Sequence, residues 1–124
     1  MLTHIRVLGY LHILIHSLLI IAGIFLTVTP ALLAVPLSMY FHLQSFAWLG
    51  FLISAFGILI LAISLPGALV GLSLINLKPR ARTYGIAISI LDIIMLNPAS
   101  IALGAYGLFV LLNPETERIF QGLA

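Results

Sequence analysis

Two long stretches of this sequence contain no charged side chain. The first runs from Val7 to about Thr29, and the second runs from Ser45 to Leu77. A helix crosses the hydrocarbon core of a bilayer, about 30 Å thick, with roughly 20 apolar residues. Only 6% of all residues are charged, against about 25% in soluble domains, so the chain lacks the polar groups for a water-facing surface. We predict an all-α integral membrane protein whose residues 1–124 form a single transmembrane domain.

The first apolar stretch predicts a membrane span over residues 5–29. It is longer than the roughly 7–15 apolar residues of a signal peptide, so we expect the chain to retain it. Pro30 and Pro36 follow, and a proline removes a helical hydrogen bond and clashes with the preceding turn. We therefore expect an apolar loop there, with Tyr40 and Trp48 near the membrane–water interface, where aromatic rings settle.

The second stretch predicts a span over residues 45–77, which is longer than a bilayer requires. Thirty-three helical residues would extend about 50 Å. Pro66-Gly67 lies inside this segment, and a proline inside a helix commonly produces a kink. We expect a second helix that is kinked at Pro66-Gly67 and continues to the membrane surface. A true break with a re-entrant piece is the alternative.

Two shorter spans are predicted over residues 83–97 and 99–113. Asn97-Pro98 separates them, and Asn113-Pro114 follows the second. Because proline disfavours helical conformation in the residue before it, and because Asn is a good N-cap, each pair predicts the start of a new helix. Short spans either cross a thinned bilayer or enter it as a helical hairpin. We expect crossing, and hence a four-helix bundle.

The basic residues indicate the orientation of this bundle. All of them fall at the start of the first span, between the second and third, or after the fourth. They are Arg6, Lys78, Arg80, Arg82 and Arg118. Four spans would place all five on one face, which the positive-inside rule makes cytoplasmic. We expect both termini on that side, with these residues as cytoplasmic anchors.

Small residues recur at helical spacing in the later spans. In lipid, close packing of small side chains drives helix association. The expected contact residues are Gly50, Ser54, Gly57, Gly67, Gly71 and Gly104. These stripes predict helix contacts within the bundle, and further contacts in a homo-oligomer or a larger complex.

Three ionisable side chains lie inside the predicted spans. His12 and His16 are four residues apart on the first, and Asp92 lies in the third. His16 is ten residues beyond Arg6, and Asp92 is ten beyond Arg82, so both lie about 15 Å from the cytoplasmic face. Intramembrane ionisable groups usually face a partner, so we expect Asp92 to bond His16 within one chain or across an interface. Alternatively, Asp92 bonds local backbone or a headgroup.

The same side chains raise the question of a cofactor. His12 or His16 could ligate haem or chlorophyll. No other span offers a second histidine, so we expect no bis-histidine haem within one chain, while a single axial ligand or a haem shared between subunits stays open. An HxxxH metal site needs a third ligand, which Asp92 alone could supply, and we predict no metal site. Phosphate-binding loops, paired carboxylates and nucleophile–base arrangements are absent from the sequence. We therefore expect a protein that is not an enzyme and binds no nucleic acid.

Two segments, "SLPGALVGLSLINLKPRAR" and "NPASIALGAYGLFVLLNPETERIF", share a recognisable pattern. It comprises a Leu-Pro-Gly start, a basic turn ending in Ala-Arg, an Asn-Pro turn, and a Gly/Tyr helix with an acidic, Phe-containing end. The matching positions are Leu65, Pro66, Gly67, Gly71, Pro79, Ala81, Arg82, Pro98, Gly104, Tyr106, Glu115 and Phe120. In these segments, and more loosely in the first span, the chain resembles a group of uncharacterised short bacterial four-helix membrane proteins.

This resemblance implies four helices in a bacterial inner membrane and implies no activity. Members of the group more often carry Asn at the position of Asp92. A site that accepts either residue needs hydrogen bonding more than it needs a charge.

Three functions remain open from the sequence. The first is a non-catalytic accessory subunit of a larger membrane complex, or a bundle that assembles with itself in the bilayer. The second is an oligomeric small transporter or channel that uses His16 and Asp92. The third is a haem- or chlorophyll-binding membrane subunit. We expect the first.

Overall fold

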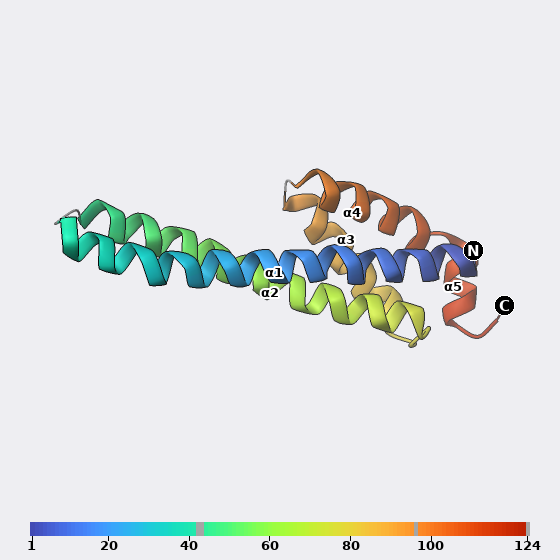
Figure 1. The fold of residues 1–124 in the computed structure, drawn as a ribbon. Coiled ribbons are helices and arrows are strands. Elements are labelled where there is room, and N and C mark those ends of the chain that lie inside the picture. The colour runs from blue at the N-terminus through green and yellow to red at the C-terminus, as the bar shows by residue number, and fades with distance from the viewer. Residues whose placement is uncertain (42–43, 96, 124) are drawn as a thin grey trace. The chain divides into compact units, whose positions relative to one another are not determined.

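The computed structural model describes residues 1–41, 44–95 and 97–123 (Figure 1). Within these ranges the chain is all-α, as predicted. Its helices are α1 (Leu2–Phe41), α2 (Gln44–Ile75), α3 (Ala81–Ile94), α4 (Pro98–Leu111) and α5 (Pro114–Phe120). By length and composition, α1 and α2 are able to cross a membrane. In contrast, α3 and α4 have 14 residues each and rise only about 21 Å.

The helices divide into two compact units. We name Met1–Ser17 together with Leu65–Ala124 the terminal unit, and Leu18–Ser64 the hairpin unit. Both α1 and α2 contribute one part to each unit.

The course of α1 differs from the prediction. This helix continues through Pro30 and Pro36 to Phe41, so the predicted loop after the first span is wrong. An open loop in an apolar setting would leave many backbone N–H and C=O groups unpaired, whereas each proline removes only one helical donor. Residues Thr29 and Val35 before these prolines also do not provide the asparagine cap that precedes Pro98 and Pro114. A continuous helix therefore leaves fewer backbone hydrogen-bonding groups unpaired than a loop would.

The other helices lie close to the predicted ranges. α2 covers residues 44–75 against the predicted 45–77, α3 covers 81–94 against 83–97, and α4 covers 98–111 against 99–113. Pro66 lies inside α2, which is helical on both sides of it. The re-entrant alternative is therefore wrong, while the kink stays a prediction.

Asparagine caps begin the two last helices, which confirms the interpretation of the Asn-Pro pairs. The Ala99 N–H donates to Asn97 Oδ1 at 3.0 Å, and the Glu115 N–H donates to Asn113 Oδ1 at 2.9 Å. Each proline occupies the first turn, where its missing N–H has no helical partner to lose.

In the hairpin unit, small residues bring α1 and α2 into close antiparallel contact. A Cβ added to Gly57 would lie 2.7 Å from the backbone nitrogen of Thr27, and one added to Gly50 would overlap the Cβ of Ala34. The Ser54 hydroxyl donates to the Thr27 carbonyl at 3.0 Å. The close packing expected at Gly50, Ser54 and Gly57 is present between these two helical segments.

In the terminal unit, α3 and α4 pair as an antiparallel hairpin, and α5 follows at its open end (Figure 1). Arg82 Nε, at the start of α3, donates to the Leu111 carbonyl at the end of α4 at 2.9 Å, and Arg82 Nη2 lies 3.3 Å from Glu117. The N-terminal amino group lies 3.2 Å from Glu115. These contacts gather Arg82, the glutamates of α5 and the N-terminal amino group at one end of the unit.

A buried apolar core fills the space between these segments. Its residues come from α1, α2, α3 and α4, and they are Ile5, Leu8, Val70, Leu74, Ala81, Ile88, Leu103, Val110 and Leu111. The core is continuous with the polar cluster described next, because Leu8 and His12 are successive positions on one face of α1.

Candidate functional site

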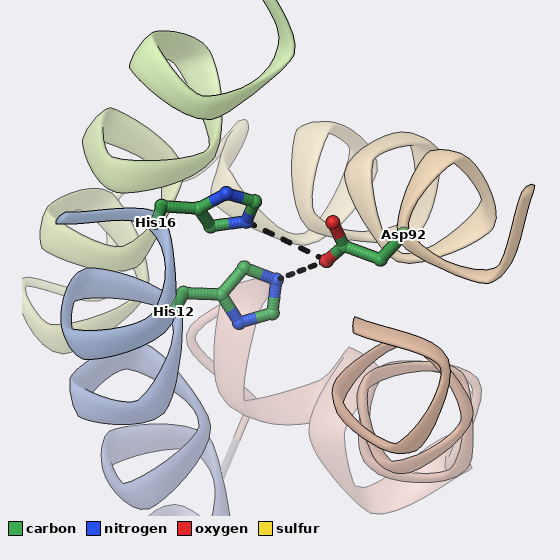
Figure 2. A group of neighbouring side chains, drawn as sticks. All are labelled: His12, His16 and Asp92. Atoms are coloured by element: carbon green, nitrogen blue, oxygen red, sulfur yellow. Dashed lines mark ion pairs between the residues drawn. The ribbon is translucent and has the colours of Figure 1, made fainter. Parts of the chain in front are cut away.

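Three ionisable side chains from two helices meet inside the terminal unit. His12 and His16 project from α1, and Asp92 projects from α3 (Figure 2). His12 Nε2 lies 3.7 Å from Asp92 Oδ2, and His16 Nε2 lies 3.5 Å from the same oxygen. The two imidazole rings are 5.5 Å apart between centroids and tilted by 39°. One carboxylate oxygen is therefore shared by two histidines one helical turn apart.

The cluster is closed off from its surroundings. His12 and His16 are 0% exposed and Asp92 is 1% exposed. Both oxygens of Asp92, both ring nitrogens of His16 and the Nε2 of His12 are buried and make no hydrogen bond. Buried polar atoms normally have partners, so five unpaired atoms in one cluster distinguish this site from the rest of the core.

One hydrogen bond defines the protonation of His12. Its Nδ1 lies 3.0 Å from the Leu8 carbonyl oxygen. A carbonyl oxygen only accepts hydrogen bonds, so Nδ1 carries the proton and donates it. In a neutral ring, Nε2 is then a bare acceptor that faces the carboxylate.

Glycines from two other helices shape this cluster. A Cβ added to Gly67 on α2 would overlap the imidazole ring of His16, and one added to Gly71 would lie 3.0 Å from the Cβ of His12. On α4, a Cβ added to Gly104 would lie 3.2 Å from the Cβ of Asp92. The sequence analysis assigned these glycines to helix packing alone. In the structure Gly67 also leaves the space that the His16 ring occupies, whereas the atoms nearest to Gly71 and Gly104 are the backbone oxygens of Gly9 and Ser89.

The remaining predicted residues lie elsewhere. Gly50, Ser54 and Gly57 belong to the hairpin unit. Of the predicted anchors, Arg82 pairs with Glu117 and the end of α4, whereas Arg6, Lys78, Arg80 and Arg118 are exposed.

Sequence reasoning missed two features of the site. It paired Asp92 with His16 and did not assign the Leu8 carbonyl that orients His12. The signal was available, because Leu8 precedes His12 by one helical turn. It also missed Gly67 as the neighbour of His16, because that contact depends on how α1 and α2 are rotated about their axes.

The geometry limits the chemistry that the cluster can perform. Neither imidazole has exposed surface, so a haem or chlorophyll ring cannot approach either one unless the helices separate. The arrangement can share a proton or hold a small cation between its three donors. Comparisons with protein-family models, curated proteins and solved structures found no match for the chain.

Proposed function

We propose that the chain is a small, non-catalytic integral membrane protein that acts as a helical accessory subunit of a larger membrane assembly. The observation that carries the proposal is the apolar character of the outer faces of the long helices. Large exposed hydrophobic side chains follow one another along both; they include Leu14, Leu18, Ile21, Phe25 and Leu32 on α1, and Leu49, Leu52, Phe56, Leu59 and Leu69 on α2. Such a surface needs lipid or protein around it.

The closed polar cluster supports a structural role. His12, His16 and Asp92 join α1 to α3 at a depth that no substrate reaches. An intramembrane polar contact of this kind holds helices in register. The cluster therefore acts as a link between helices rather than as a reaction centre.

The proposed topology has four membrane-inserted helices and both termini in the cytoplasm of a bacterial cell. It is supported by the joint position of the N-terminus, Arg82 and α5 at one end of the terminal unit. The basic residues Arg6, Lys78, Arg80 and Arg118 would then face the cytoplasm with them. With 14 residues each, α3 and α4 would cross a thinned bilayer.

Cysteine labelling tests this topology, because the natural chain contains no cysteine. Lys78→Cys, Gln44→Cys and Ala99→Cys each introduce one thiol at an exposed position. In sealed cells, we expect a membrane-impermeant maleimide to label positions 44 and 99 but to label position 78 only after lysis. Labelling of 78 but not 44 in intact cells would reverse the orientation, and protection of 99 alone would make α3 and α4 a re-entrant hairpin.

The subunit role has a separate test. The full chain, extracted from its native membrane in a mild detergent, is expected to run as an assembly well above its 13.4 kDa monomer mass, with identifiable partner chains. Light scattering that subtracts bound detergent measures this mass. A monodisperse monomer without partners would contradict the proposal.

An oligomeric transporter or channel is less well supported. It would require His16 and Asp92 to line a path, and both are sealed in this packing. Proton or cation flux into liposomes that falls on Asp92→Asn substitution would favour it over the subunit role.

A further inference from the structure

His12, His16 and Asp92 present the donor set of a transition-metal site. We propose that this cluster binds one divalent transition-metal ion, of which zinc is the best match, through His12 Nε2, His16 Nε2 and one oxygen of Asp92. Imidazole nitrogen and carboxylate oxygen are standard zinc ligands. The proposal goes beyond the subunit role, because a protein can assemble with partners whether or not it holds a metal.

The separations between the donor atoms favour a metal over hydrogen bonds. The two nitrogen–oxygen distances are 3.7 and 3.5 Å, longer than the roughly 2.7–3.2 Å of an N–H···O bond. Ligands that lie about 2.0–2.1 Å from a tetrahedral zinc ion are separated from one another by about 3.3 Å. One donor atom from each of the three residues lies within 4.8 Å of the others. Side-chain rotations would therefore bring the three donor atoms to coordination distance from one metal ion.

The orientation of His12 is that of a metal ligand. Its Nδ1–H donates to the Leu8 carbonyl, which leaves the Nε2 lone pair directed at the other two residues. Metal-bound histidines commonly donate their second ring nitrogen to a carbonyl or carboxylate, which fixes the tautomer. Without a proton or a cation between them, this lone pair and the carboxylate of Asp92 would repel each other.

Burial supplies the third argument. Asp92 is 1% exposed, and both of its oxygens lack hydrogen-bond partners. An isolated carboxylate in an apolar interior is strongly unfavourable, and a divalent cation would offset its charge. Two neutral imidazoles and one carboxylate leave a net charge of +1 on such an ion, so a singly charged anion in a fourth position would make the site neutral.

The test uses Co²⁺ as the probe, since four-coordinate Co²⁺ absorbs visible light far more strongly than the hydrated ion. The full chain is refolded into detergent micelles with Co²⁺ present, so that burial does not prevent access. We expect one Co²⁺ per chain with intense visible absorption, and we expect Zn²⁺ to displace it. No absorption and no retained metal after gel filtration would overturn the proposal.

Variants separate the cluster from adventitious binding. Asp92→Asn removes the charged ligand and is expected to weaken Co²⁺ binding more than 100-fold, beyond the roughly 10- to 100-fold typical of losing an outer-shell partner. His4→Gln is the matched control, because His4 lies on the same helix, is exposed and contacts Tyr106 instead. Equal binding by wild type and Asp92→Asn, or loss of binding in His4→Gln alone, would overturn the proposal.

Gly67→Ala gives a second, independent test. It keeps all three donor side chains but places a Cβ on the ring of His16, so we expect Co²⁺ binding to fall at least tenfold. Far-UV circular dichroism monitors folding, and if this variant does not fold, Asp92→Asn decides the question. A folded Gly67→Ala protein with undiminished Co²⁺ absorption would mean that His16 is not a ligand.

Discussion

The hairpin unit and the terminal unit hold their helices together in different ways. Residues 18–64 contain no Lys, Arg, Asp or Glu. All eight charged residues of the chain therefore lie in the terminal unit. In the hairpin unit, glycines bring backbones into contact and the Ser54 hydroxyl bonds a carbonyl across the pair. In the terminal unit, Gly9 and Gly71 also bring backbones into contact, but Gly67 instead makes room for the ring of His16.

This difference shows that similar small-residue stripes serve two purposes. Backbone-to-backbone contact is tolerant of which side chains surround it, because its strength comes from proximity. For a glycine that accommodates one ring, the effect of a substitution depends on whether that ring is present. Substitutions in the two units should therefore differ in whether a second substitution can rescue them.

The largest effect is expected for Gly67→Ala. The added methyl overlaps the His16 ring, and overpacking of this kind typically costs about 1–3 kcal/mol. We expect the free energy of unfolding to fall by that amount, measured by SDS titration in mixed micelles with a chelator present. Adding His16→Ala should restore part of the loss, because the ring that the methyl meets is gone.

The contrasting substitution lies in the hairpin unit. A Cβ at Gly57 meets the Thr27 hydroxyl at 2.5 Å, but it also meets the Thr27 nitrogen at 2.7 Å and the Gly23 carbonyl oxygen at 2.9 Å. The last two are backbone atoms, which Thr27→Ala does not remove. Thr27→Ala should therefore not rescue Gly57→Ala. If both pairs are rescued equally, or neither is, the distinction between Gly67 and Gly57 is wrong.

Asp92→Ala is expected to destabilise the terminal unit by about 1–3 kcal/mol. The two buried imidazoles would lose the carboxylate that lies beside both of them. Asp92→Asn should lose much less in the same chelator-containing titration. Its amide can donate a hydrogen bond to the bare Nε2 of His12. Equal losses in the two variants would show that the carboxylate charge itself is required for stability.

A smaller effect is expected at the charged end of the terminal unit, where Arg82 contacts Glu117. Arg82→Gln removes the bond to the Leu111 carbonyl and the pair with Glu117, and we expect a loss of about 1–2 kcal/mol. Glu117→Gln removes only the pair, and the Glu117 side chain is 45% exposed. The loss should therefore stay below about 1 kcal/mol and vanish in high salt. SDS titration at two salt concentrations distinguishes the two contributions.

The smallest effect is expected for Ser54→Ala in the hairpin unit. Its hydroxyl makes a cross-helix bond to Thr27, and bonds of this kind between membrane helices average about 0.6 kcal/mol. Ser38→Ala is the matched control, since Ser38 bonds Val35 within its own helix. A loss above about 2 kcal/mol in Ser54→Ala would mean that polar contacts hold the hairpin unit as firmly as the terminal unit.

Much of the helical layout could be predicted from the sequence, because apolar runs and Asn-Pro pairs act locally. The start of α4 follows from Asn97 and Pro98, which need only their own backbone to form the cap. The prolines of α1 misled the prediction for a physical reason. Proline breaks helices readily in water, where freed carbonyls are solvated, but an apolar environment offers no such compensation.

The site could be predicted in part. Counting helical rise from Arg6 and Arg82 puts His16 and Asp92 at equal depth, and the structure has them 3.5 Å apart. Depth says nothing about rotation about the helix axis. The approach of His12 to the same oxygen of Asp92, and the fit of Gly67 against His16, depend on that rotation. The rotation follows from the packing of all the helices of the terminal unit.

In the proposed membrane topology, the continuity of α1 through its two prolines has a consequence for the thickness of the surrounding bilayer. Forty residues measure about 60 Å along the helix axis. Even at a tilt of about 40°, the upper end of the usual range, a 30 Å core covers only about 26 residues. About 14 residues of α1 then extend beyond the hydrocarbon core of the bilayer. A thicker membrane or a neighbouring protein must shield them, so lipid chain length should control how strongly this chain associates.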